Sequence, residues 1–375
     1  MPTVTIGSAG ADFATLALWE TNLVGSGGLK ATAEGRIFAV TSLNGNTFNG
    51  IDTSAFRVVI KPSVSGAFWQ HVSASSNPVQ ANSSFGAMIS GNSGDMLVFN
   101  DVPVTISGLM LASSAPYAST VRITDTAACA AARDTNIVNT VMYSTGVAGG
   151  GTYTRNVLVS GAQILRMKNV VSWLNPAAGG AQNHAHVAHD MGAPSRVEAT
   201  NCTFTTTSGG QATWSIRALG IRASAPVLRN NLFQNSDSQS QGDVSGANAT
   251  GGHNVSNIAT ASTVFLSSAA PFWGGVAITS SLVSFQASAG VPYGLDASLK
   301  AGAATTIVDN ACATWAPATD VLNRTRQAPH DIGAFDLNAT WGAPPPPPPP
   351  PAASNVYPYN PLGNLVVDLG GLRYY

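Results

Sequence analysis

Short apolar segments of strand character recur along the middle of the chain at intervals of about thirty residues. Apolar side chains alternate with polar ones in these segments, as in strands that bury one face. The segments are residues 104–111, 136–143, 164–171, 197–204 and 227–233, with a weaker copy at 252–256. A fixed period of this length is typical of a solenoid, whose coils bury their apolar faces against one another. The sequence therefore predicts an all-β fold, a right-handed parallel β-helix.

One position within the repeat is marked by small or amide residues. These residues are Gly108, Asn139, Asn169, Asn201 and Asn231. Glycine and asparagine accept left-handed backbone angles, and asparagine side chains can stack as a ladder along a column of coils. We expect these residues to occupy equivalent turns.

The two ends of such a column need covers, because strand edges are otherwise left unpaired. Residues 12–23 predict a short capping helix in which Asp12 is the N-cap. Phe13, Leu16, Trp19 and Leu23 would share its buried face. We assign residues 1–30 to this N-terminal cap, 31–300 to the β-helix body and 301–343 to a C-terminal closing region.

Within the closing region, Ile332 and Phe335 suggest a terminal strand that packs onto the body. Beyond it, residues 344–351 are all proline and predict a stiff, extended spacer.

The last segment, residues 352–375, is apolar and rich in tyrosine, so we interpret it as an anchoring tail. Its strand-like part could add to a partner's sheet while its tyrosines fill pockets. Folding back onto the chain's own body is the alternative. The expected contact residues are Tyr357, Tyr359, Leu362, Leu365, Val367, Leu369, Leu372, Tyr374 and Tyr375.

Charged residues make up 9% of the chain and the net charge is −1, which leaves no basic field for nucleic acid or anionic lipid. No apolar run reaches the length of a membrane span, and the N-terminus has no secretion-signal pattern. We expect synthesis in the cytoplasm of a host bacterium, without membrane insertion. The cysteines Cys129, Cys202 and Cys312 have no metal-binding spacing and are expected to be buried.

Five segments resemble those of pectate-lyase-like right-handed β-helix proteins, especially those of tailed bacteriophages. They are the opening residues 6–20, the segments 51–54 and 58–62, and the closing motifs 323–326 and 329–336. The resemblance covers about residues 1–338 and excludes the proline run and tail. It implies the β-helix fold, a homotrimer and a place on the virion surface. Its motifs carry no catalytic signature.

Two groups of side chains are candidates for chemistry. His184 and His186 alternate on a predicted strand, and His189 follows, so the three are weak candidates for a metal site; a polar loop is the alternative. Glu198 lies one repeat after Arg166 and Lys168, and we interpret this pairing first as a surface ion pair and second as a catalytic group. We predict no cofactor.

These observations favour a non-enzymatic virion protein: a trimeric head decoration or head-fibre protein whose residues 352–375 bind the major capsid protein or another virion protein. The alternative is a tail fibre or tailspike that recognises a host surface glycan. If that alternative were catalytic, it would be a polysaccharide lyase or a glycoside hydrolase, although the shortage of carboxylates argues against catalysis.

Overall fold

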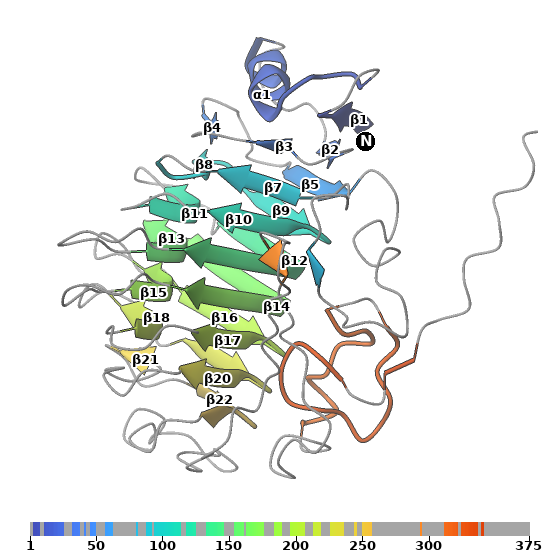
Figure 1. Cartoon of the computed structure of the whole chain (residues 1–375), viewed down its shortest axis with the longest axis vertical. Coiled ribbons are helices and arrows are strands. Elements are labelled where there is room, and N and C mark those ends of the chain that lie inside the picture. The colour runs from blue at the N-terminus through green and yellow to red at the C-terminus, as the bar shows by residue number, and fades with distance from the viewer. Residues whose placement is uncertain are drawn as a thin grey trace, which may run out of the picture. The chain divides into compact units, whose positions relative to one another are not determined.

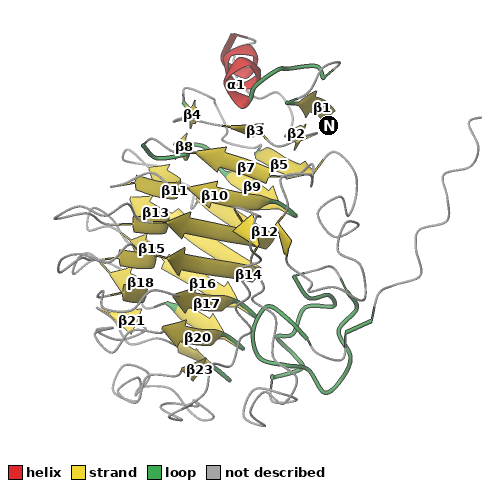
Figure 2. Cartoon of the chain, in the orientation of Figure 1, coloured by secondary structure: helices red, strands yellow, loops and turns green. Residues whose placement is uncertain are grey.

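The computed structural model is all-β, with long parallel sheets and one described helix (Figures 1 and 2). It describes residues 3–7, 11–25, 32–37, 41–42, 46–49, 57–62, 80–81, 88–91, 94–113, 118–124, 133–145, 154–160, 163–175, 184–189, 196–206, 213–218, 226–235, 244–245, 250–256, 293–294, 311–321, 324–336 and 339–340. The chain divides into two compact units, Met1–Thr340 and Trp341–Tyr375. All described residues belong to the first unit.

The larger sheet contains fifteen of the described strands in two rows that share the long strands β12 and β14. The first row is β1 (Thr3–Ile6), β2 (Ala33–Ile37), β5 (Val58–Pro62), β9 (Val104–Ser107), β12 (Arg133–Thr145), β14 (Gln163–Asn175), β16 (Arg196–Thr200), β19 (Val227–Arg229) and β22 (Thr250–Gly252). The second row adds β3 (Thr41–Ser42), β7 (Met88–Gly91), β10 (Met110–Ser113), β17 (Thr203–Thr206), β20 (Leu232–Asn235) and β23 (Val255–Ser256).

A second parallel sheet has seven described strands and receives the chain after each pass through the larger sheet. Its strands are β4 (Asn46–Phe48), β8 (Leu97–Asn100), β11 (Ala118–Thr124), β13 (Thr154–Ser160), β15 (His184–His189), β18 (Thr213–Ala218) and β21 (Val244–Ser245). Successive passes therefore stack as coils, each adding strands to the same sheets. This arrangement is consistent with the predicted solenoid. A separate antiparallel pair joins β24 (Tyr293–Gly294) to β6 (Gln80–Ala81).

The turn between the two rows is built from residues with left-handed backbone angles. Asn139, Asn169 and Asn201 have φ of 47°, 52° and 50°, and Gly108 has φ of 67°. These four predicted turn residues are confirmed. Asn231 is wrong by one position, because Asn230 has the left-handed angle, φ 55°.

Asn231 instead points into the protein, where its amide nitrogen donates to the carbonyl of Ala199 at 2.9 Å and to Asn254 Oδ1 at 2.9 Å. The sequence offered two adjacent asparagines. The first has the turn geometry, and the second satisfies buried backbone groups.

The helix α1 (Leu16–Gly25) lies at the N-terminal end of the larger sheet (Figure 1). Leu16, Trp19 and Leu23 are buried, as predicted, and Trp19 packs edge-on against Phe48 with ring centroids 5.9 Å apart. Gly35 permits this approach, because a Cβ there would lie 2.6 Å from the Trp19 ring. Among the described residues there is no helix long and apolar enough to cross a bilayer.

The predicted N-cap of this helix is wrong. Thr15 Oγ1 accepts from the backbone N–H of Leu18 at 3.2 Å, so threonine caps the helix. The carboxylate of Asp12 instead accepts from the backbone N–H of Thr5 at 2.7 Å and from its hydroxyl at 3.0 Å. These bonds lower the pKa of Asp12.

The core is a column of apolar side chains in which equivalent residues of adjacent coils stack. Phe48 lies on Phe99 with ring centroids 5.1 Å apart, and Phe204 lies on Phe233 at 5.0 Å. The parallel register pairs the same residues, so stacking follows from strand alignment. Cys202 is buried in this column, as predicted, whereas Cys312 is partly exposed and Cys129 lies outside the described residues.

Candidate functional site

The outer face of the first row carries a groove of about 330 Å³. Strands β12, β14, β16 and β19 align Asn136, Arg166 and Glu198 in one line, and Val138, Lys168, Thr200 and Arg229 in the next. These residues line the groove together with Met167, Thr314 and Trp315. Their alternation with buried residues such as Val197 and Ala199 explains why so many polar groups share one outer face.

The side chain of Arg166 holds two carboxylates beside the groove. Its Nε donates to Glu198 Oε2 at 3.0 Å, and its Nη1 contacts Asp134 Oδ2. Arg196 Nη2 lies 2.7 Å from the other oxygen of Glu198. Burial alone would lower the pKa of Arg166, but the bonds to Asp134 and Glu198 outweigh it and raise that pKa. The ion-pair interpretation of Glu198 is confirmed with Arg166 as the partner.

The positive charge of Arg166 is balanced by these carboxylates. The charges of Lys168 and Arg229 are not balanced in this way, so the groove is positively charged. Lys168 is exposed, and Arg229 is half-buried. In the described part of the chain, Nε of Arg229 is buried and has no hydrogen-bond partner. Among the described residues no carboxylate pairs with Arg229, so its guanidinium is left to attract an anion that enters the groove.

An aromatic side chain forms one wall of the groove. The Trp315 ring lies 5.5 Å from Cζ of Arg229, a cation–π contact, and meets His253 edge-on at 5.9 Å. Trp315 belongs to a tight turn in which its backbone N–H and that of Ala316 both donate to the Cys312 carbonyl at 3.1 Å. The wall therefore comes from a segment far from the coils in sequence.

That segment, which we call the closing segment (residues 311–340), docks along the side of the coils on the row of turn asparagines. Asn230 Nδ2 donates to the Cys312 carbonyl at 3.0 Å, and the Cys312 N–H donates to Asn230 Oδ1 at 2.9 Å. Asn169 Nδ2 donates to the Thr319 carbonyl at 2.6 Å.

The turn asparagines also bond to one another. Asn169 Nδ2 donates to Asn139 Oδ1 at 2.9 Å, and Asn230 Nδ2 donates to Asn201 Oδ1 at 3.2 Å. The predicted ladder is thus present as two bonded pairs of asparagines, and these residues also form the docking site of the closing segment.

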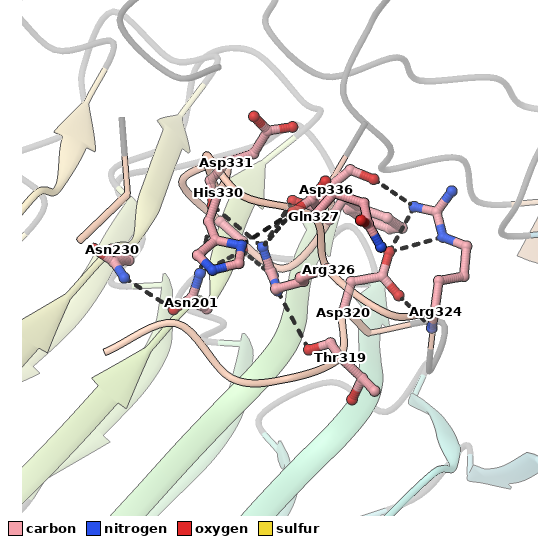
Figure 3. Close-up of polar contacts among 12 residues, drawn as sticks. Asn201, Asn230, Thr319, Asp320, Arg324, Arg326, Gln327, His330, Asp331 and Asp336 are labelled. Carbon is pink, nitrogen blue, oxygen red and sulfur yellow. Dashed lines mark hydrogen bonds and ion pairs between the residues drawn. The ribbon is translucent and has the colours of Figure 1, made fainter. Parts of the chain in front are cut away.

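The centre of the closing segment is the buried side chain of Arg326 (Figure 3). It donates to the carbonyls of Gly333 at 2.7 Å, Asp331 at 3.2 Å and Thr319 at 3.3 Å. Its Nη2 also reaches Asn169 Oδ1 at 3.4 Å. Burial lowers the pKa of Arg326, an effect that the nearby carboxylates oppose. One side chain therefore organises the irregular backbone around it.

Ile332 and Phe335 are buried, as predicted, but Ile332 lies in a bend, Phe335 lies in irregular backbone, and neither is in a strand. Gly333, with φ of 101°, donates its N–H to the Asn230 carbonyl at 2.8 Å. A Cβ there would lie 2.9 Å from Thr203 Oγ1. The close approach and the left-handed φ together require glycine at this position.

A second polar row runs through the interior. Ser144 donates to Asn156 Oδ1 at 2.6 Å, Asn156 Nδ2 donates to Ser172 Oγ at 2.7 Å, and Ser172 lies 2.9 Å from His186 Nδ1. His186 is buried and packs edge-on against Phe204 at 5.7 Å. This metal candidate is thus part of the interior packing.

The remaining predicted site residues fall mostly outside the described chain. The side chains of His184 and His189 are not described, and all of the tail residues from Tyr357 to Tyr375 lie beyond the described ranges. In the described residues there is no cluster of three or more histidine, cysteine or acidic side chains placed to hold a metal.

Sequence reasoning missed Trp315, Arg229 and Arg326. The register of the repeat aligns Thr200 with Arg229. This part of the groove could therefore have been predicted from the sequence. Trp315 had no such signal, because it lies outside the repeat and meets Arg229 only through the docking of a distant segment.

Comparison with protein-family models, with curated proteins and with solved structures gave no match. The resemblance to bacteriophage β-helix proteins therefore remains a prediction from the sequence.

Proposed function

We propose that the chain is a right-handed parallel β-helix protein displayed on the surface of a tailed bacteriophage, as a trimeric head decoration or head fibre. The stacked parallel strands support the fold, and connections between parallel strands of one sheet are almost always right-handed. On this proposal the body is a passive scaffold and residues 352–375 attach it to the major capsid protein or another virion protein.

The structural role is supported by one observation: carboxylates on the outer face of the described strands are held in ion pairs with arginine. Asp134 and Glu198 both bind Arg166, and Glu198 also binds Arg196. Glycoside hydrolysis needs one carboxyl group to give a proton while a second acts as base or nucleophile. Carboxylates held by guanidinium groups suit a stable surface better than that chemistry.

The test is co-sedimentation of the full chain, and of a truncation ending at residue 343, with purified heads and separately with purified tails of the parent virus. Binding to heads by the full chain alone supports a tail-anchored head protein. Binding that survives truncation would overturn the anchoring role of residues 352–375. Sedimentation equilibrium of the full chain tests the expected trimer.

A second candidate function is recognition of a host surface glycan as a tail fibre or tailspike. The groove favours it, because Trp315 offers an aromatic ring while Asn136, Thr200 and Thr314 offer amide and hydroxyl groups. Sugars present the matching combination of apolar ring faces and hydroxyl groups. Release of reducing ends or unsaturated products from host capsule or lipopolysaccharide would show that recognition extends to cleavage.

A further inference from the structure

We propose that the closing segment completes a binding groove for an anionic saccharide, and that Asn230 is the positioning residue that holds the Trp315 wall in place. This inference rests on the second proposed function, glycan recognition. It adds the charge of the ligand and the dependence of the groove on a docked segment.

The charge of the ligand follows from the groove's cations. Arg166 already binds Asp134 and Glu198, so its charge is matched within the protein. Lys168 and Arg229 are the cations that remain for a ligand, and Nε of Arg229 is buried without an acceptor in the described part of the chain. A carboxylate or phosphate group on a ligand would pair with these two cations, and a charge-assisted hydrogen bond is stronger than a neutral one.

The saccharide character follows from the rest of the lining. Trp315 provides an aromatic surface, and Asn136, Thr200 and Thr314 can both donate and accept hydrogen bonds. Hydroxyl groups on a sugar ring need partners of both kinds. Nucleic acid would present an anion as well, but the whole chain has a net charge of −1 and offers little long-range attraction to a polyanion.

The positioning role follows from the two bonds between Asn230 and Cys312, at 3.0 and 2.9 Å. The carbonyl of Cys312 also accepts the N–H groups of the turn that carries Trp315. Asn230 is adjacent in sequence to Arg229, so one short stretch of the coil presents the cation and fixes the aromatic wall. Ligand binding and docking of the closing segment should therefore be coupled.

The test is isothermal titration of the full chain with a glucuronate-containing tetrasaccharide, its carboxyl-reduced neutral counterpart, the corresponding sugar phosphate and an oligothymidylate. We expect the two anionic sugars to bind at least about tenfold more tightly than the neutral one, because a charged hydrogen bond is lost on reduction. Arg229→Gln should bring the affinities for the acidic and the neutral sugar to nearly the same value, so the quantity measured is the ratio of the two affinities.

The positioning role is tested by a double-mutant cycle. Asn230→Gly keeps the left-handed turn, since glycine accepts that geometry, but removes both bonds to Cys312. We expect it to weaken binding by about the same factor as Trp315→Ala, with no further loss in the double variant. Asn139→Gly is the matched control, because Asn139 occupies the same turn position and its Oδ1 accepts from Asn169. It should leave affinity unchanged.

The outcomes separate the claims. Equal binding of acidic and neutral sugars would overturn the anion claim while leaving glycan recognition intact. Additive losses for the Asn230 and Trp315 variants, or an equal loss in Asn139→Gly, would overturn the positioning role. Binding of oligothymidylate in preference to every sugar would overturn the saccharide claim, and absence of binding to any sugar would reject this inference together with glycan recognition by the groove.

Discussion

At the scale of the residue, the turn asparagines combine three tasks that few side chains could share. Asn169 has φ of 52°, donates to Asn139, and donates to the Thr319 carbonyl of the closing segment. Asparagine is tolerated in the left-handed region, and its amide carries both a donor and an acceptor. The asparagine that marks the repeat thus adopts the left-handed turn, bonds to the asparagine of a neighbouring coil and binds the closing segment.

Replacement of Asn169 should separate these tasks. Asn169→Leu introduces left-handed strain and leaves buried polar groups unpaired, so we expect a loss of about 2–4 kcal/mol in unfolding free energy. Asn169→Gly removes only the polar contacts and should cost less. Urea unfolding followed by circular dichroism measures both, and equal midpoints for the two variants would contradict a role for the backbone angle.

The two described cysteines should differ in reactivity. Burial raises the pKa of Cys202 to about 12, and its Sγ lies 3.4 Å from the Thr200 carbonyl. The thiolate is the reactive form, so Cys202 should resist iodoacetamide at pH 8 in the folded protein, whereas the partly exposed Cys312 should react. Peptide mapping by mass spectrometry checks this. Equal labelling of both residues before urea is added would show that Cys202 is accessible.

A buried carboxylate near the N-terminal coils predicts a specific pH dependence. Glu34 is 1% exposed and lies 2.8 Å from Lys61 Nζ and 2.7 Å from Arg36 Nε. Burial would raise its pKa, but these two partners outweigh that effect and lower the pKa below 4.5. The unfolded chain then binds this proton more readily, so the stabilisation is present above about pH 4.5 and is lost as the pH falls through the folded pKa.

Glu34→Gln should therefore melt at a lower temperature than the natural protein near pH 7, and the difference should shrink on acidification. Thermal unfolding of both proteins from pH 7 to pH 3 makes the comparison. A constant difference across that range would mean that ionisation of Glu34 contributes nothing to stability.

At the scale of the element, the closing segment is held by polar contacts as much as by apolar ones. Arg326 bonds to four carbonyls of its own segment and reaches Asn169 of the coils. Ile332 and Phe335 add buried apolar area. The segment is irregular, so its carbonyls lack the partners that a sheet supplies, and the guanidinium provides them.

Arg326→Met should release the closing segment from the coils. The change removes the donors of several buried carbonyls and the guanidinium that lies 3.8 Å from Asp336 Oδ2, and loss of one partner of a buried charged group costs about 3–5 kcal/mol. Hydrogen exchange should show faster exchange over residues 311–336 while β12 and β14 stay protected. Arg324→Met is the control, because Arg324 pairs with Asp320 at 2.8 Å in a less buried position. Equal effects of the two variants would contradict the central role of Arg326.

The sequence predicted the elements with local signals and missed those made by distant contacts. The thirty-residue spacing located Asn139, Asn169 and Asn201, because each coil repeats the same turn. The choice between Asn230 and Asn231 depended on which residue faces the interior, which composition does not reveal. The Trp315 wall arises from docking between residues 230 and 312, far apart in the chain, and no repeat or motif marks it.

At the scale of the whole molecule, the proposed function assigns a scaffold role to the coils and an anchor role to residues 352–375. Many polar groups of the described coils are paired in asparagine contacts, interior hydrogen bonds and ion pairs, which suits the proposed role as a stable surface. Residues 344–351 are all proline, and the tail after them is rich in tyrosine. Three copies in a trimer would bring three such tails to one particle and strengthen a modest contact through avidity.

The most direct test of this division is competition for the particle. Labelled full-length protein is bound to purified particles of the parent virus, and a peptide of residues 352–375 is added beside a scrambled peptide of the same composition. We predict that the natural peptide displaces the protein and the scrambled peptide does not. Retention of the protein at saturating natural peptide would contradict attachment through the tail and place the particle contact on the coils.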